Sequence, residues 1–270
     1  MQSFVAAAIQ MHSGPDKAAN LAEAEARVGE AARAGAQLLA LPEVFSWRGP
    51  LGGEQAVAED IPGPTTDAMA ALARRLGIHL VAGSILEKAP DGGRPFNTAT
   101  LFGPDGSLLA RYRKVHLFDV DIPGKVTVKE SDSRAPGDQV VSVATALGRI
   151  GLAICYDLRF PELFRRHADA GTEVVVMPSA FTMTTGRAHW EVLVRARAIE
   201  NQCFVVAPDQ YGAGASGLLD HGNSLVVDPW GVVLGRGPDD AAAVVSATLD
   251  AATLDRVRHE LPCLTHRRLA

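Results

Sequence analysis

The chain has 270 residues, a formal net charge of −5 and 47% hydrophobic residues. This composition supports a packed core and excludes a disordered chain, and the mild acidity gives no electrostatic footprint for nucleic acid or a membrane surface. Without a signal-peptide pattern, a run of ~18 apolar residues or closely spaced cysteines, we expect one cytoplasmic domain over 1–270 with no membrane partner.

Strand-like and helix-like segments alternate along the first half of the chain. Thr65 or Thr66 is the expected N-cap of the second helix, and Gly77 lies beyond its end. The turn of the expected hairpin is Pro-Asp-Gly. The predicted elements are a strand at 4–11, a helix at 16–35, a strand at 37–43, a helix at 65–77, a strand at 79–87 and a hairpin at 97–115.

The second half continues the alternation, and no linker or repeat interrupts it. The order of elements favours a mixed α/β structure over a helix bundle or an all-β sandwich. The predicted elements are a strand at 149–157, a helix at 159–171, a strand at 173–181, a helix at 187–201 and strands at 203–211, 223–231 and 242–250.

Three reactive side chains lie where an apolar strand ends. Cys155 ends a strand and precedes a helix, so the positive end of that helix is expected to favour its thiolate. Glu43 follows the strand QLLALP, and Lys114 closes an alternating strand. Reacting groups gather at such positions in open α/β sheets. Each residue alone also fits a bland interpretation, namely a packed core cysteine or a solvated charge.

The segments around these residues resemble the nitrilase superfamily of carbon–nitrogen hydrolases. LPEVF, YRKVHLFD and GLAICYDLRFPEL are similar to the segments that carry its Glu-Lys-Cys triad, and the similarity extends over nearly the whole chain to GNSLVVDPWG. The spacing of Lys114, Glu130 and Cys155 resembles the Nit-type amidase branch. The resemblance implies a four-layer α-β-β-α sandwich, and a homodimer or higher homo-oligomer formed through helices.

The resemblance also implies roles that suit the chemistry of each residue. Cys155 is expected to be the nucleophile that forms a thioester, and Glu43 the proton carrier. Lys114, together with the backbone N–H of Tyr156, is expected to stabilise the oxyanion. Glu130 matches a second glutamate beside the lysine and is expected to position it; the alternative is a surface charge in a polar loop.

The nucleophile segment and its surroundings bear on the substrate. Cys155 is followed by Tyr-Asp where true nitrilases resemble Cys-Trp-Glu, so we expect an amide substrate and release of ammonia or an amine. Arg159, Phe181 and Thr185 match an α-keto-acid clamp in which Arg159 pairs with a carboxylate. The alternatives are an ion pair of Arg159 with Glu162 or Asp157, and ordinary core packing of Phe181.

The resemblance leaves several small-molecule substrates open. Our leading expectation is the terminal amide of deaminated glutathione. The alternatives are an ω-amidase acting on α-ketoglutaramate, and an aliphatic amidase or N-carbamoyl amino acid hydrolase with the same triad. A non-catalytic relative that kept the fold is a further reading, although all three triad residue types are present.

Other motifs carry little functional signal. GAGASG at 212–217 matches G-x-G-x-x-G, but a turn and a strand follow it where a dinucleotide site needs a helix. We expect this segment to be a mobile loop at the mouth of the site. The eight histidines lack metal-ligand spacing, so neither a metal nor a cofactor is expected. His116 lies two residues after Lys114 and could line the site, but a packed or solvated histidine is favoured.

Overall fold

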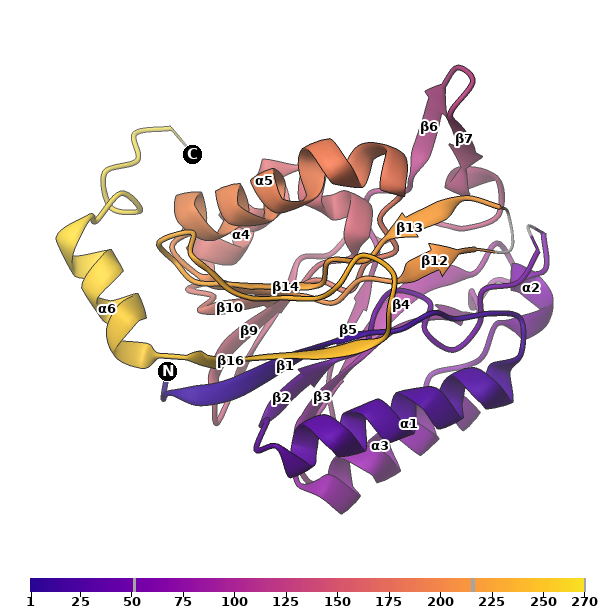
Figure 1. The fold of residues 1–270 in the computed structure, drawn as a ribbon, viewed down its shortest axis with the longest axis horizontal. Helices are drawn as coiled ribbons and strands as arrows, with labels where there is room; N and C mark the ends of the chain where they lie inside the picture. Colours follow the sequence, from indigo (N-terminus) through magenta and orange to yellow (C-terminus); the bar gives the residue numbers. More distant parts are fainter. Residues whose placement is uncertain (51, 215–216, 270) are drawn as a thin grey trace.

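The protein consists of two stacked six-stranded sheets, as the computed structural model describes for residues 1–50, 52–214 and 217–269 (Figure 1). The first sheet has the order β16-β1-β2-β3-β4-β5, and the second has the order β15-β14-β11-β10-β9-β8. The first comprises β1 (Phe4–Gln10), β2 (Leu38–Ala40), β3 (His79–Glu87), β4 (Phe96–Phe102), β5 (Leu108–Arg113) and β16 (Ala243–Leu249). The second comprises β8 (Val141–Thr145), β9 (Gly148–Leu152), β10 (Val174–Val176), β11 (Phe204–Ala207), β14 (Leu225–Val227) and β15 (Val233–Arg236).

Helices cover the outer face of each sheet. In Figure 1, α1 and α3 lie along the first sheet, and α4 and α5 lie along the second. The helices are α1 (Lys17–Arg33), α2 (Glu54–Val57), α3 (Pro64–Leu76), α4 (Pro161–Asp169), α5 (Met183–Asn201) and α6 (Ala251–Glu260). The arrangement confirms the expected four-layer α-β-β-α sandwich.

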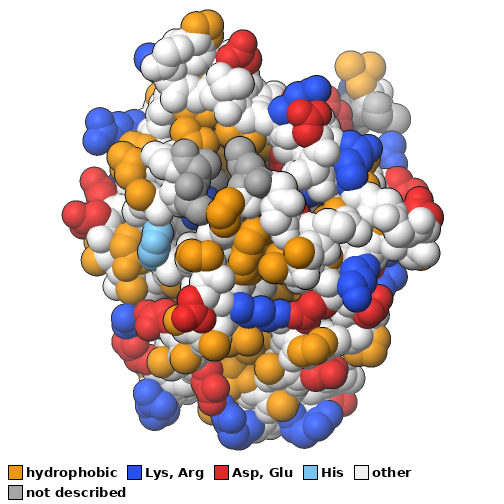
Figure 2. Space-filling model, turned by 90° about the vertical axis from the view of Figure 1, so that its right-hand side faces the viewer, with side chains coloured by type: hydrophobic (Ala, Val, Ile, Leu, Met, Phe, Trp, Pro, Cys, Tyr) orange, Lys and Arg blue, Asp and Glu red, His pale blue; other side chains and the backbone are white. Residues whose placement is uncertain are grey.

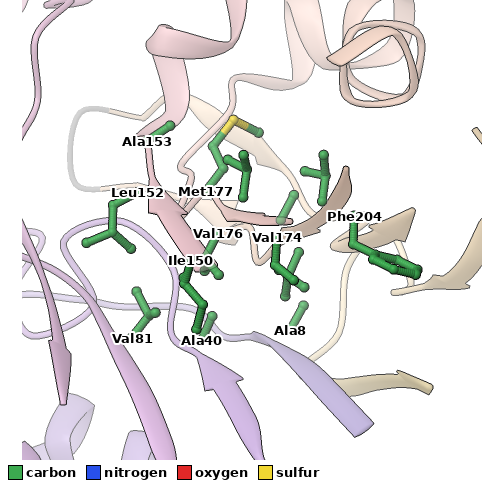
Figure 3. Close-up of a cluster of buried hydrophobic side chains, with 14 of the residues drawn as sticks. Ala8, Ala40, Val81, Ile150, Leu152, Ala153, Val174, Val176, Met177 and Phe204 are labelled. Atoms are coloured by element: carbon green, nitrogen blue, oxygen red, sulfur yellow. The ribbon is translucent and has the colours of Figure 1, made fainter. Parts of the chain in front are cut away.

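The core between the sheets combines small residues of the first sheet with branched residues of the second. Ala8, Ala40 and Val81 lie opposite Ile150 and Val174, all fully buried (Figure 3). Alanines on one side let the branched side chains on the other fill the space, which close packing of protein interiors requires. Strands β2 and β10 are buried on both faces, which explains why their sequences read as unbroken apolar runs.

The centre of each sheet is parallel, and this places the carboxyl ends of its strands at one edge. Strand β2 pairs in parallel with β1 and β3, and β10 pairs in parallel with β9 and β11. A backbone hydrogen bond of 3.2 Å from Glu43 N to Ser179 O joins the segment after β2 to the segment after β10. The carboxyl ends of the two sheets therefore meet at the same end of the molecule.

Several local features differ from expectation. No element was predicted between residues 115 and 149, but residues 119–129 form a hairpin of β6 (Asp119–Ile122) and β7 (Val126–Lys129), because the side chains alternate around a Pro-Gly turn. The segment 212–217, expected to be a loop, begins within strand β12 (Tyr211–Ala213), which pairs with β13 (Leu219–His221) after it; residues 215–216 lie outside the described residues.

The N-terminus of α3 also differs from expectation. Gly63 is the N-cap in place of Thr65 or Thr66, because Pro64 has a preset φ and no N–H and so begins the helix. Thr66 accepts a hydrogen bond of 2.8 Å from Gly63 N. Gly77 does end the helix, with φ of +65°.

Candidate active site

Glu43 lies in a tight turn after β2 and is only 4% exposed. The next residue, Val44, has φ of +46°, a costly conformation for a β-branched residue. Its N–H donates a hydrogen bond of 2.8 Å to Ser84 Oγ on β3. Gly83 lets this turn come close, since a Cβ there would lie 2.1 Å from Pro42 O. Packing against β3 therefore fixes the direction of the Glu43 side chain.

Cys155 lies at the start of the short 3-10 helix η2 (Cys155–Arg159) that follows β9. Its φ is +45°, a strained value of the kind found at functional turns. The backbone N–H of Cys155 donates to Pro178 O at 2.9 Å, which fixes the turn against the segment after β10.

The resting state of this cysteine differs from the sequence prediction. Burial raises the pKa of the Cys155 thiol well above its usual value, and the Glu43 carboxylate raises it further; Lys114 opposes them in part. We expected a thiolate favoured by the helix end, but desolvation outweighs that effect. Burial therefore opposes ionisation of this thiol, which needs a base to become nucleophilic.

Lys114 directly follows β5 and is 2% exposed, so its ammonium group lies in the protein interior. Its Nζ donates to Glu43 Oε1 at 2.8 Å and to Glu130 Oε2 at 2.9 Å. Burial alone would favour the neutral amine, but the charges of Glu130 and then Glu43 outweigh it and raise the Lys114 pKa. The ammonium is therefore permanently charged and held in one place.

Glu130 begins the short 3-10 helix η1 (Glu130–Asp132) after β7 and is 7% exposed, which excludes the surface-loop alternative. Besides Lys114, its carboxylate accepts from Phe118 N at 2.7 Å and from Arg134 Nη1 at 2.5 Å. Burial disfavours the charge, but Lys114 and then Arg134 outweigh it and lower the Glu130 pKa to about 2. Glu130 thus lies beside the lysine, where the resemblance put it.

Two further groups that we had not predicted complete this network. Asn97 Nδ2 on β4 donates to Glu43 Oε1 at 2.7 Å and lies 3.4 Å from Glu130 Oε1. The backbone N–H of Ala180 donates to Glu43 Oε2 at 3.0 Å and also faces the Cys155 sulfur. The Glu43 carboxylate is therefore held by Lys114, by Asn97 and by the N–H of Ala180, the last of which also faces the thiol.

A buried carboxylate joins the lysine segment to the nucleophile turn. Asp157 is fully buried and accepts from Tyr112 Oη at 2.7 Å, from Ile154 N at 2.8 Å and from His116 N at 3.0 Å. The ring of His116 bonds the same carboxylate through Nδ1 and stacks on Phe160. His116 is therefore a packed residue, as favoured, and Asp157 holds the two segments together.

The catalytic candidates border a cavity of about 640 Å³, within the usual range for small-molecule sites. It lies at the end of the molecule formed by α2, β7 and β13. Figure 2 shows this end, where charges of both signs are mixed with hydrophobic side chains. The cavity is lined by Glu43, Val44, Arg48, Gly52, Glu54, Lys114, Phe118, Thr127, Val128, Lys129, Glu130, Asp132, Ser133, Arg134, Cys155, Tyr156, Ala180, Phe181, Thr182, Thr185, Leu218 and Asp220.

Two of the three predicted substrate-binding residues line the cavity, and the third packs beside one of them. Phe181 and Thr185 line the cavity, whereas Arg159 is not among its lining residues. Arg159 Nη1 lies 3.1 Å from His189 Nδ1, and its guanidinium lies 5.1 Å from the centre of the Phe181 ring. Asp157, offered as an alternative partner of Arg159, instead bonds Tyr112 and His116.

Two arginines that sequence reasoning missed do line the cavity. Arg48 pairs through both terminal nitrogens with the buried Asp220 of β13. Arg134 contacts Glu130, and its Nη2 lies 3.9 Å from Glu54. Neither arginine lies in a strand or helix pattern, so only a tertiary contact could have revealed it.

Within residues 1–50, 52–214 and 217–269, no group of His, Cys, Asp and Glu side chains is placed to hold a metal ion. Among the same residues, no helix has the length and hydropathy needed to span a membrane.

The geometry gathers a thiol, a carboxylate and an ammonium group around one cavity. The N–H of Tyr156 belongs to the first turn of η2, where helical backbone donors have no partner within the helix. A carbonyl carbon that reaches the Cys155 sulfur would have Lys114 available to its oxygen and Glu43 available as the base. A four-layer fold with this site defines the class of thiol hydrolases that includes the nitrilase superfamily.

Comparison with known proteins narrows the class to a family. The profile of the carbon–nitrogen hydrolase family matches residues 5–259, and the chain belongs to this family. The omega-amidase NIT2 of Danio rerio is 41% identical over 268 residues, covering 99% of this chain and 96% of that protein. The human omega-amidase NIT2 is 41% identical over 270 residues with the same coverage. The chain is therefore an amide-hydrolysing enzyme.

Solved structures agree with this assignment. The C. elegans NitFhit protein has a TM-score of 0.92 and 38% identity, over 99% of this chain and 66% of that chain. Saccharomyces cerevisiae Nit3, a member of branch 10 of the nitrilase superfamily, has a TM-score of 0.89 and 32% identity, over 99% of this chain and 97% of its own.

Proposed function

We propose that the protein is an ω-amidase that hydrolyses the terminal amide of a short α-keto acid, with α-ketoglutaramate as the representative substrate. The observation that carries the amidase chemistry is the buried hydrogen-bonded cluster of Glu43, Lys114 and Glu130 beside the Cys155 thiol. The ω-amidase assignment rests on the 41% identity to omega-amidases over 99% of the chain.

The proposed reaction has two halves that share one base. Glu43 takes the proton of Cys155 as the sulfur attacks the amide carbon, and Lys114 with the N–H of Tyr156 stabilises the oxyanion. Glu43 then gives the proton to the amide nitrogen, so ammonia leaves and a thioester remains. In the second half Glu43 deprotonates a water molecule, which attacks the thioester carbonyl; the acid leaves and the thiol is restored.

The Danio rerio and human relatives favour our alternative substrate over the leading expectation of deaminated glutathione, since both carry the name omega-amidase. Both compounds have an α-keto acid at one end and an amide at the other. Arg159, Phe181 and Thr185 remain our proposed contacts for the keto-acid end. Because Arg159 does not line the cavity, this proposal requires its guanidinium to leave His189 when substrate binds.

Hydrolysis of a substrate panel tests the proposal; it is followed as release of ammonia, or, for deaminated glutathione, as release of cysteinylglycine, because the amide nitrogen of that compound leaves as an amine. The panel contains α-ketoglutaramate, deaminated glutathione, an N-carbamoyl amino acid and propionamide, each scored by kcat/KM. We expect the highest value for α-ketoglutaramate, and loss of turnover in Cys155→Ala. The control is Cys263→Ala, which removes a half-buried free thiol elsewhere and should leave turnover intact.

Two outcomes separate the possible errors. Undiminished release by Cys155→Ala would refute the thiol mechanism altogether. A higher kcat/KM for deaminated glutathione, with the Cys155→Ala loss retained, would refute only the substrate choice.

We further propose a homodimer, or a higher homo-oligomer, in the cytoplasm. A group of exposed apolar side chains on α5 and around the β14–β15 turn supports self-association: Val192, Ile199, Trp230 and Val232 are 66%, 45%, 53% and 48% exposed. Three free cysteines suit a reducing compartment. Light scattering of Val192→Asp against the wild-type protein tests the interface, and an unchanged mass would argue against it.

A further inference from the structure

The charged network at the nucleophile extends one residue beyond the glutamate–lysine cluster. Arg134 has only 16% of its side chain exposed and lines the cavity. Its Nη1 donates to Glu130 Oε1 at 2.5 Å, while the other oxygen of Glu130 accepts from Lys114. Its Nε is buried without a hydrogen-bond partner. One carboxylate thus separates the two cations.

The balance of charge explains why such an arginine matters. Glu43 and Glu130 carry two negative charges, and Lys114 carries one positive charge. Without Arg134 this buried cluster would have a net charge of −1 beside a thiol that must become a thiolate. With Arg134 the cluster is neutral, which lowers the electrostatic cost of ionising the sulfur.

We propose that Arg134 is a positioning residue for amide hydrolysis: it compensates the charge of Glu130, so that the field of Lys114 remains available to the sulfur of Cys155 and to the oxyanion. The proposal depends on the amidase chemistry and not on which amide is hydrolysed. Arg134 acts through Glu130 and has no role here as a direct ligand of the reacting atoms.

The other charged groups near the sulfur do not duplicate this role. The charges that act on Cys155 directly are those of Glu43, Lys114 and Asp209. Arg48 lies in the field of Glu43, but it is bound through both terminal nitrogens to Asp220. Its positive charge is therefore already matched by a carboxylate of its own.

A second carboxylate limits the effect of Arg134 and provides an independent test. Glu54 is buried, lines the cavity and lies 3.9 Å from Arg134 Nη2. Its negative charge opposes the contribution of the guanidinium. If the charge near Glu130 sets the ionisation of Cys155, removing the Glu54 charge must shift it in the opposite direction from removing Arg134.

The experiment measures the rate of Cys155 alkylation by iodoacetamide against pH, which reports the thiolate and needs no substrate. We expect Arg134→Met to raise the apparent pKa by about one unit, roughly tenfold less thiolate at a fixed pH. Arg134→Lys keeps the charge and should retain most of the wild-type profile. Glu54→Gln should move the profile to lower pH.

The matched control is Lys129→Met. Lys129 also lines the cavity and carries one positive charge, but its side chain is 65% exposed and pairs with Asp132. Because water screens this charge, the apparent Cys155 pKa in Lys129→Met should stay within about 0.2 units of the wild-type value. A similar shift in Lys129→Met and Arg134→Met would indicate a general cavity field and overturn the proposal.

Further results would overturn the proposal. One is an unchanged alkylation profile in both Arg134→Met and Glu54→Gln. Another is a loss of kcat/KM in Arg134→Met confined to substrates with a carboxylate, with an unchanged profile, because Arg134 would then bind substrate directly. Should Arg134→Met fail to fold, Glu54→Gln and Arg134→Lys still decide the question. Failure of the proposed ω-amidase substrate would leave all these profiles unaffected.

Discussion

Replacement of Asp157 should weaken both the fold and the chemistry, because this carboxylate ties the lysine segment to the nucleophile turn. In Asp157→Ala, the buried donors Tyr112 Oη and Ile154 N lose their acceptor. Each unsatisfied buried donor costs about 1–3 kcal/mol. The His116 ring is partly exposed and can form a hydrogen bond with water instead, so we assign it no contribution to the loss of stability.

We therefore expect Asp157→Ala to lower the free energy of unfolding by about 2–6 kcal/mol, since two buried donors lose their acceptor. Asp157→Asn keeps the shape and one acceptor oxygen, so its loss should be about half as large. Both variants loosen Cys155 relative to Lys114, and we expect kcat to fall by roughly a hundredfold in Asp157→Ala, since small misplacements carry such costs.

Urea unfolding followed by tryptophan fluorescence measures the stability, and ammonia release measures kcat. The control is Asp255→Ala, which removes an exposed carboxylate from α6 and should change stability by less than about 0.5 kcal/mol. If Asp157→Ala unfolded within 1 kcal/mol of wild type, the hydrogen-bond reasoning would be wrong. A destabilised variant with full kcat would show that Asp157 stabilises the fold without positioning the site.

Three other changes test separate parts of the structure. Gly83→Ala would push a Cβ against Pro42 O, so we expect at least about 2 kcal/mol lower stability in urea unfolding and weaker turnover through displacement of Glu43; wild-type values would contradict this. Burial lowers the pKa of His167 to about 4. The unfolded chain then binds more protons, so stability should fall by roughly 2–3 kcal/mol from pH 6.5 to pH 4, and His167→Gln should flatten this dependence in pH-resolved unfolding. Lys114→Met removes an oxyanion donor and should lower kcat by roughly 10²–10³; ammonia release at the wild-type rate would exclude that role.

The fold class and the location of the candidate site could be predicted from the sequence, and the reason is physical. Apolar runs flanked by turn residues mark buried strands, and reactive side chains after such runs lie at the carboxyl ends of the sheets, which meet at one end of the molecule. Glu43, Lys114 and Cys155 follow this rule. Helix ends were less accurate: α5 begins at Met183 and not at Arg187, and its N-cap Thr182 makes no side-chain capping hydrogen bond.

What the sequence did not reveal depends on contacts between distant segments. Asn97 and Arg134 do not stand out in any sequence pattern. They acquire a role only because the fold brings Asn97 of β4 to Glu43 and Arg134, which follows η1, to Glu130. The raised pKa of the Cys155 thiol also escaped prediction, because the degree of burial at a turn depends on how the layers pack together. The β6–β7 hairpin could have been predicted from the sequence, since the side chains of residues 119–129 alternate around a Pro-Gly turn.

The division of the catalytic candidates between two sheets has a consequence for the maturing chain. Glu43 and Lys114 follow strands of the first sheet, and Cys155 follows a strand of the second. Neither sheet carries all three catalytic candidates, so hydrolysis becomes possible only after the two sheets have packed together. Amide hydrolysis therefore reports completed folding, and a partly folded chain is expected to be inactive.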